Sequence, residues 1–184
     1  MDIIVFGDSS KSSIIDKFLD DYSKDHKDST EDCYPCTLNV DGESIQLNIT
    51  DTVGQDDFAA MRKAYMRQGK GFILVYAIDD RASFEEIESF HRELVRTKST
   101  SNVPCVICGN KCDLEERRII SKAEGEELAE KLKCKFYETS ALTNTNIHET
   151  FLTLVKEIMA ENKPAPQPDP QPKPASGGSC CLLI

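Results

Sequence analysis

Short apolar runs alternate along the chain with segments in which apolar residues recur every three or four positions. The first pattern is typical of strands buried inside a sheet, and the second is typical of helices that bury one face. Four runs have the strand-like pattern: 3–6, 71–78, 104–109 and 135–138. Helix-like spacing fills the stretches between them, so the sequence predicts strands that alternate with helices.

Polar residues mark where the predicted helices begin. Helix-like spacing starts at Ser12 in the first helix, and Asn146 stands where the last helix begins. Ser83 and Ser121 each stand three residues before a glutamate, which is the pattern of a capping box at a helix N-terminus. We therefore predict helices that begin near these residues.

Two stretches of alternating apolar and polar residues, 38–40 and 45–49, flank the dipeptide Asp41-Gly42. This combination is typical of an antiparallel hairpin with a tight turn. Together with the four apolar runs it predicts an α/β fold, namely a doubly wound, mostly parallel six-stranded sheet with one antiparallel edge strand. Ligands bind such sheets at the carboxyl ends of the strands.

The composition of the chain changes near its end. After Asn162 the sequence becomes rich in proline and then in serine and glycine. We predict a folded domain over residues 1–162 and a disordered, proline-rich tail over residues 163–184. No apolar run approaches about 20 residues, and the N-terminus lacks the basic region of a signal peptide. We expect the chain to stay in the cytosol unless a group is attached to it.

The formal net charge of −10 limits the partners of the protein. A nucleic-acid-binding protein needs a basic surface to neutralise phosphates, so we expect no nucleic-acid partner. The same charge argues against simple electrostatic adhesion to anionic membranes. Any phosphate ligand must be held by local geometry.

Two pairs of cysteines have the spacing of half a zinc site, Cys33 with Cys36 and Cys105 with Cys108. The second pair lies in a predicted buried strand. Residues three apart on a strand point to opposite faces, so Cys105 and Cys108 cannot bind one metal ion. We expect free thiols in a reducing compartment.

The tetrapeptide Asn110-Lys111-Cys112-Asp113 follows a predicted strand directly. The carboxylate of Asp113 can accept hydrogen bonds from both N1–H and the 2-amino group of guanine. Adenine offers no such pair, so it would leave a buried charge unpaired. Asn110 would tie this loop to the phosphate loop, and the stem of Lys111 would cover the base. Taken alone, the motif could equally be a surface turn.

A second loop, 138–142, follows the next strand and strengthens the prediction of a guanine site. The backbone N–H of Ala141 could donate to guanine O6. We predict that this loop completes the pocket with three residues: Ser140, Ala141 and Leu142.

The segment Asp51-Thr52-Val53-Gly54-Gln55 follows the second hairpin strand. Asp51 can hold a water molecule bound to Mg²⁺, as the acidic residue that ends a strand does in phosphate-transferring enzymes. The N–H of Gly54 can approach a γ-phosphate because no Cβ blocks it. Gln55 is then placed to orient an attacking water, which makes it the candidate catalytic residue. The alternative interpretation is a glycine turn after an edge strand.

In their order along the chain, these motifs resemble the Ras-like small GTPases. The resemblance also extends through 61–67, 72–78 and 103–104, and it covers the chain up to about Lys163. It is strongest with the Ras and Rap branch. It implies the G domain of the P-loop NTPases, Mg²⁺ as cofactor, and GTP or GDP as ligand. It further implies a signalling switch with effector proteins, a guanine-nucleotide exchange factor and a GTPase-activating protein as partners. We expect a monomer.

The phosphate-binding segment departs from the family pattern Gly-x4-Gly-Lys-Ser/Thr. Between Gly7 and Lys11 it is two residues short, and it lacks the second glycine. The resemblance implies that Lys11 reaches the β- and γ-phosphates and that Ser12 binds Mg²⁺. Without a gap, Ser13 would occupy the lysine position. We favour Lys11, because a Lys-Ser pair that opens a helix is the chemically useful part; the alternative is a polar turn with a solvated lysine.

The short loop should offer fewer N–H donors to a phosphate, and its aspartate adds a negative charge. Its side chains could also crowd the arginine of an activating protein. We therefore predict slow hydrolysis of GTP and poor stimulation. The candidate phosphate contacts in this segment are Gly7, Asp8, Ser9, Ser10, Lys11, Ser12 and Ser13.

The first switch of the family is matched by residues 29–34, one residue short. The resemblance implies a hydroxyl here that contacts both the γ-phosphate and Mg²⁺. Thr30 is the candidate, although counting back from Glu31 gives Ser29, and the two alternatives stay open.

The last four residues, Cys181-Leu182-Leu183-Ile184, fit the C-a-a-X pattern and predict prenylation of Cys181. One lipid usually needs a second signal. The tail contains only two lysines, so Cys180 is the candidate for palmitoylation. We expect the protein at the cytoplasmic face of a membrane, with the plasma membrane favoured. The alternative is a chance cysteine pair in a disordered tail.

Two other functions remain open. A pseudo-GTPase would keep the fold, the guanine pocket and the anchor but would signal without a hydrolytic cycle. A P-loop kinase is disfavoured, because the chain lacks an arginine cluster typical of a lid.

Overall fold

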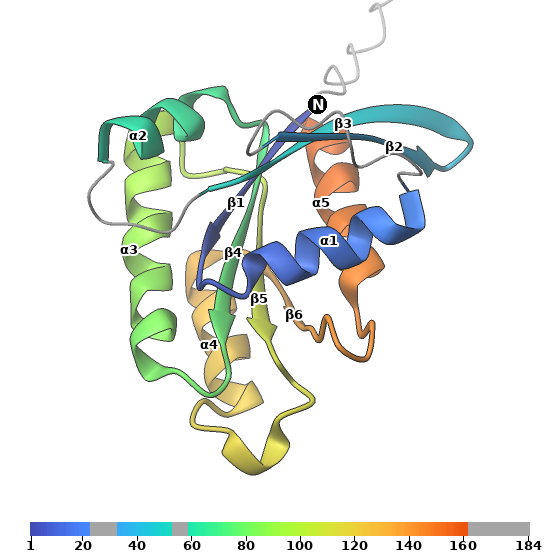
Figure 1. The fold of residues 1–184 in the computed structure, drawn as a ribbon. Helices are drawn as coiled ribbons and strands as arrows, with labels where there is room; N and C mark the ends of the chain where they lie inside the picture. Colours follow the sequence, from blue (N-terminus) through green and yellow to red (C-terminus); the bar gives the residue numbers. More distant parts are fainter. Residues whose placement is uncertain (23–32, 53–58, 162–184) are drawn as a thin grey trace, which may run out of the picture.

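The computed structural model describes residues 1–22, 33–52 and 59–161, and its central feature is one six-stranded sheet in the order β2-β3-β1-β4-β5-β6 (Figure 1). The strands are β1 (Asp2–Gly7), β2 (Cys33–Val40), β3 (Glu43–Asp51), β4 (Gly71–Ala77), β5 (Cys105–Asn110) and β6 (Lys135–Glu138). The helices are α1 (Lys11–Tyr22), α2 (Ala59–Gln68), α3 (Arg81–Lys98), α4 (Lys122–Leu132) and α5 (Ile147–Glu161), with a short 3-10 turn at Glu115–Arg117.

The pairing of the strands confirms the predicted fold class. β1 lies parallel to both β3 and β4, and β4, β5 and β6 continue the parallel sheet. β2 is the edge strand and runs antiparallel to β3, with Val40 paired to Glu43 across the predicted Asp41-Gly42 turn. The prediction of a tail over 163–184 lies outside the described residues.

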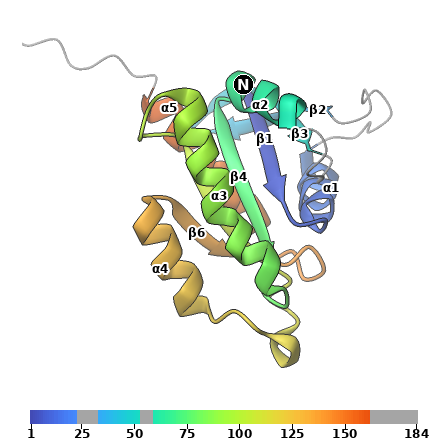
Figure 2. The same ribbon diagram turned by 90° about the vertical axis from the view of Figure 1, so that its left-hand side faces the viewer.

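Helices cover both faces of the sheet (Figures 1 and 2). One core cluster joins α1 and α5 to alternate residues of the strands, and a second joins α2, α3 and α4 to the opposite face. β4 lies at the centre, and all seven of its residues are buried. Within the described residues, no helix has both the length and the apolar character needed to cross a bilayer.

The two predicted capping boxes had different outcomes. Ser121 and Glu124 form one at the start of α4, as predicted. The prediction at Ser83 is wrong, because α3 begins earlier, with Asp80 as its N-cap. The hydroxyl of Ser83 instead donates to the carbonyl of Asp80 and accepts from the N–H of Ala77, so it ties α3 to the end of β4.

Helix α2 was not identified from the apolar pattern. Only Met66 among its described side chains is fully buried, and Tyr65 is partly buried. A helix with so narrow an apolar stripe has weak periodicity, so its contact with α3 could not be read from spacing alone.

The thiols of Cys105 and Cys108 lie in different core clusters on opposite faces of β5, as the strand pattern predicts. The loops that follow β1, β4, β5 and β6 gather at one end of the sheet, and the N-terminus and the end of α5 lie at the other (Figure 1). The loops after β1, β5 and β6 carry candidate site residues.

Candidate nucleotide-binding site

Asp113 is held in place by the loop that follows β6. Its carboxylate accepts a hydrogen bond from the Ser140 hydroxyl at 2.5 Å, and that same hydroxyl accepts from the backbone N–H of Thr143 at 3.1 Å. Ser140 is fully buried, whereas Asp113 is exposed. A buried hydroxyl therefore orients an exposed carboxylate, which is the arrangement needed to present two acceptor oxygens to a ligand.

Asn110 connects the loop after β5 with the loops after β1 and β6. Its side-chain amide donates to the Ser10 hydroxyl at 2.9 Å, and its side-chain oxygen accepts from the Thr139 hydroxyl at 3.2 Å. The residue is 2% exposed. The predicted tie between these loops is therefore present, and Thr139 is a supporting residue that the sequence analysis missed.

Lys111 lies in a left-handed turn with φ of +65°. Its ammonium group forms an ion pair with Asp79 at 3.1 Å, and the next residue, Cys112, donates its backbone N–H to the carbonyl of Thr139. Asp79 follows β4, far from Lys111 in sequence, so the spacing of residues gave no signal for this pair. The ion pair fixes the half-exposed lysine stem over the edge of the site.

The remaining predicted guanine contacts are on the loop after β6. Ala141 is half-buried directly after Ser140, and the Leu142 side chain is 82% exposed. The loop is closed by a bridge between Ser140 and Thr145. It therefore holds the backbone of Ala141 beside the Asp113 carboxylate.

Lys11, Ser12 and Asp51 meet at the start of α1 and the end of β3. The Ser12 hydroxyl donates to one Asp51 carboxylate oxygen, and the Lys11 ammonium lies 3.5 Å from the other. Lys11 is 4% exposed, whereas Ser13 is exposed on the first turn of the helix. This geometry favours the alternative in which Lys11, and not Ser13, contacts the phosphates.

The same cluster suits a hard divalent cation. The Asp51 oxygen that faces Lys11 is buried and accepts no hydrogen bond from the described residues. Hydroxyl and carboxylate oxygens are ligands that Mg²⁺ prefers. Ser12 and Asp51 would therefore hold Mg²⁺ directly or through water.

The segment before Lys11 forms a tight turn that satisfies its own donors. The N–H of Ser10 donates to the Asp8 carboxylate at 2.8 Å, and the N–H of Lys11 donates to the Asp8 carbonyl at 3.0 Å. The N–H of Asp8 itself donates to the carbonyl of Val75 on β4. Three N–H groups that a phosphate loop would offer to a ligand are therefore already used.

The ionisation of Asp8 follows from this turn. Burial alone raises the pKa of the Asp8 carboxyl, but hydrogen bonds from Ser10 and Ser9 and the charge of Lys111 outweigh burial, so the net pKa is lowered. The carboxylate is therefore charged at neutral pH, in a place where a bound phosphate would also be negative.

Gly7 is required at the point where β1 leaves the sheet. Its φ is +116°, and a Cβ there would lie 2.0 Å from the carbonyl oxygen of Val75. A side chain at this position would push β1 away from β4. Ser9, the middle residue of the turn, is exposed.

Several predicted contacts lie outside the described residues. These are the candidate catalytic residue Gln55, the phosphate contact Gly54, the switch hydroxyl at Thr30 or Ser29, and the lipidation sites Cys180 and Cys181. They stay predictions.

Comparison with known proteins agrees with this geometry. The model of the Ras family matches residues 2–160. A Ras-like protein named rasS from Dictyostelium discoideum is 50% identical over 145 residues, which cover 79% of this chain and 73% of that protein. A Ras-like protein from Laccaria bicolor is 42% identical over 158 residues, which cover 85% of this chain and 76% of that protein. The chain therefore belongs to the Ras family of small GTPases, which are GTP-binding signalling switches.

Proposed function

We propose that this GTPase binds GTP and GDP together with Mg²⁺ at the end of the sheet where the segments that carry Asp113, Asn110 and Lys11 gather (Figure 1). The observation that carries the proposal is the chain of hydrogen bonds from Asp113 through Ser140, and from Asn110 to Ser10. These contacts link the loop that carries the Asp113 carboxylate to the turn before the buried Lys11, which supports one connected site. Adenine has no pair of donors for that carboxylate, so ATP should bind poorly.

In the proposed complex, Lys11 contacts the β- and γ-phosphates, and Ser12 and Asp51 hold Mg²⁺. The cation would neutralise charge on the phosphate oxygens. Gln55 would orient the attacking water, Gly54 would donate to the γ-phosphate, and the hydroxyl of Thr30 or Ser29 would sense it.

We propose that hydrolysis is slow. Three N–H groups of the turn at Asp8 are hydrogen-bonded to Asp8 or to Val75, so they cannot donate to the phosphates unless the loop rearranges. The same turn supports a second candidate, a pseudo-GTPase that binds effectors without cycling. The two differ in whether bound GTP is converted to GDP at all.

The proposed partners follow from the family, namely effector proteins that bind the GTP form, an exchange factor and an activating protein. We place the protein at the cytoplasmic face of a membrane, with the plasma membrane favoured, through prenylation of Cys181 and palmitoylation of Cys180.

The base-specificity experiment compares GTP, ATP and xanthosine triphosphate on purified protein with Mg²⁺ and with a chelator. We expect wild type to prefer GTP over ATP by at least about a thousandfold, because a bound base would bury the Asp113 carboxylate, and burying it without a hydrogen-bond partner costs several kcal/mol. Asp113→Asn should reverse the preference towards xanthine, whose 2-oxo group can accept from the new amide. Chelation should weaken GTP binding in both proteins.

The control is Glu127→Gln, an exposed carboxylate on α4, which should leave all three affinities unchanged. Equal binding of ATP and GTP by wild type would contradict the proposed site. Single-turnover conversion of GTP to GDP then separates the two candidates, because a pseudo-GTPase gives none.

A further inference from the structure

Three reactive side chains lie close together near the amino ends of β5 and β6, at the end of the sheet opposite the nucleotide loops. Cys105 begins β5, Cys134 lies between α4 and β6, and His91 reaches them from α3. Cys134 packs against the core cluster that contains Cys105, and its thiol donates a hydrogen bond to the carbonyl of Leu132 at 3.6 Å. Cys105 and the His91 ring are also close enough to Cys134 to act on its ionisation. Nothing in the proposed nucleotide site uses this cluster.

The backbone brings the two thiols within bonding reach. Val106 pairs with Lys135 in the parallel register of β5 and β6, so the residues before them, Cys105 and Cys134, lie side by side. Neighbouring strands are about 4.8 Å apart, and disulfides join Cα atoms about 4.4–6.8 Å apart. Closing a disulfide therefore needs little movement of the backbone.

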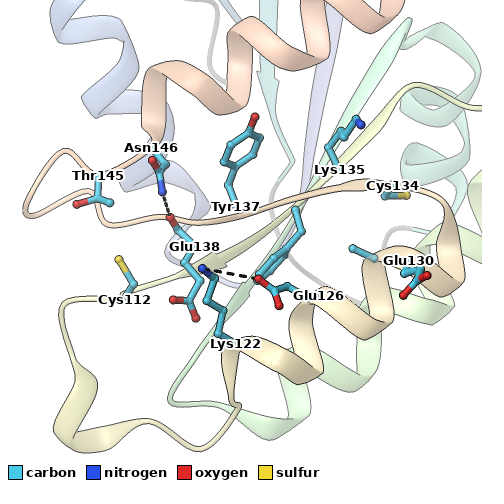
Figure 3. Close-up of a pocket in the computed structure, with 12 residues that line it drawn as sticks. Cys112, Lys122, Glu126, Glu130, Cys134, Lys135, Tyr137, Glu138, Thr145 and Asn146 are labelled. Atoms are coloured by element: carbon cyan, nitrogen blue, oxygen red, sulfur yellow. Dashed lines mark hydrogen bonds and ion pairs between the residues drawn. The ribbon is translucent and has the colours of Figure 1, made fainter.

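The two cysteines differ in access. Cys105 is 2% exposed, whereas Cys134 is half-buried and lines a pocket of about 460 Å³ between α4 and β6 (Figure 3). Figure 3 shows Cys134 at one side of the lining residues and Cys112 at the other. A small molecule in solution can reach Cys134 but not Cys105.

We propose that Cys134 and Cys105 form a peroxide-sensitive dithiol in which Cys134 is oxidised first and Cys105 then closes a disulfide with it. The Cys134 thiolate attacks one oxygen of a hydroperoxide, the O–O bond breaks, and a sulfenic acid forms. The released hydroxide or alkoxide takes a proton and leaves as water or alcohol. The Cys105 sulfur then attacks the Cys134 sulfur, and water leaves with the Cys105 proton. Two thiols are oxidised and one peroxide is reduced.

The electrostatic surroundings support this order. The neighbouring Cys105 thiol and the His91 ring lower the pKa of Cys134 against the effect of its burial, and the pairing with Cys134 together with burial raises the pKa of Cys105. Glu157 on α5 opposes the thiolate, while Lys135 on β6 offsets that carboxylate. The accessible sulfur is thus the more nucleophilic one.

Cys112 provides a matched comparison inside the same molecule. It is also half-buried and lines the same pocket. Burial and the carboxylates of Glu138 and Asp113 raise the pKa of Cys112. Exposure alone would make Cys112 and Cys134 react alike, whereas the dithiol makes Cys134 react first.

The test uses the full chain, reduced and then freed of reductant. A first aliquot receives a limiting dose of iodoacetamide at pH 7, and peptide mass spectrometry gives the rate at each cysteine. We expect Cys134 to be alkylated about tenfold faster than Cys112, in keeping with thiolate control of reactivity. A second aliquot receives hydrogen peroxide, and we expect a peptide linked through Cys105 and Cys134.

Variants separate the two steps. Cys105→Ser should accumulate a sulfenic acid at Cys134 that a 1,3-diketone probe traps, and Cys112→Ser should form the disulfide as wild type does. Alkylation of Cys112 at the same rate as Cys134, or peroxide treatment that leaves both Cys105 and Cys134 open to later alkylation in unfolded protein, would overturn the proposal. The alkylation rates and the peroxide treatment are both measured on wild-type protein, so a variant that fails to fold does not decide the outcome.

Discussion

At the scale of single residues, the informative position is Asp8. The sequence showed that the phosphate loop was two residues short and carried an extra negative charge. It could not show that the carboxylate turns back onto the N–H of Ser10, because that contact depends on backbone angles of the turn. By contrast, a tie from Asn110 to the phosphate-binding segment was predicted, since both belong to motifs with fixed roles in the family, and the structure identifies its partner as Ser10.

Replacing Asp8 tests whether its carboxylate competes with the nucleotide. Asp8→Ala frees the N–H of Ser10 and removes one negative charge from the loop that would face the phosphates, so we expect GTP and GDP to bind about tenfold more tightly. The nucleotide-free protein should lose about 1 kcal/mol of unfolding free energy, because the turn loses its side-chain acceptor. Fluorescent-nucleotide titration and thermal unfolding measure the two effects.

If the Asp8 carboxylate competes with the nucleotide, its removal should raise nucleotide affinity while it lowers the free energy of unfolding. Glu127→Ala removes a distant exposed carboxylate and should change neither quantity. If Asp8→Ala weakens nucleotide binding, the carboxylate supports the site and the competition argument is wrong.

At the scale of elements, the positions of strands were predicted more accurately than the ends of helices. Buried parallel strands are continuous apolar runs, so β4 and β5 stood out from their polar flanks. Helix starts depend on a single capping side chain, and a Ser-x-x-Glu pattern occurs inside helices too. This is why Ser121 was placed correctly and Ser83 was not.

The packing between β4, β5 and α4 contains a hydroxyl that no pattern revealed. The Tyr76 oxygen is buried, with no hydrogen-bond partner among the described residues, and burial raises the pKa of this phenol. A Cβ at Gly109 or Gly125 would lie 2.7 or 2.5 Å from that oxygen, so both glycines make room for it.

Tyr76→Phe should therefore keep or raise the unfolding free energy, by up to about 1 kcal/mol, because it removes an unsatisfied buried group. The matched control is Tyr137→Phe, whose hydroxyl is hydrogen-bonded to Thr153 at 2.8 Å and should cost about 1 kcal/mol. Chemical denaturation measures both. A larger loss for Tyr76→Phe than for Tyr137→Phe would show that the Tyr76 hydroxyl has a partner.

At the scale of the whole molecule, the fold class followed from the alternation of strand and helix patterns, because strand order in doubly wound sheets is tightly constrained. The family followed from the order of the motifs along the chain. Apart from the tie made by Asn110, the site was predicted as separate motifs, and the structure showed the other contacts that join them. The contacts of Lys111 with Asp79 and of Asn110 with Thr139 link residues far apart along the chain.

The proposed anchor is also a property of the whole chain. Cys181→Ser should release the protein from membranes into the cytosolic fraction, and Cys180→Ser should lower the membrane-bound share while mass spectrometry still finds the prenyl group, since one lipid gives marginal binding. High salt should release little protein, because the tail has only two lysines in a chain of net charge −10. Release by salt, or membrane retention of Cys181→Ser, would contradict the proposal.

The end of α5 and the nucleotide loops lie at opposite poles of the sheet (Figure 1). If residues beyond Glu161 attach the protein to a membrane, the nucleotide loops would face away from that membrane. The attachment segment and the nucleotide loops would then be independent of each other. The length of the segment could be altered without disturbing the loops that bind the nucleotide.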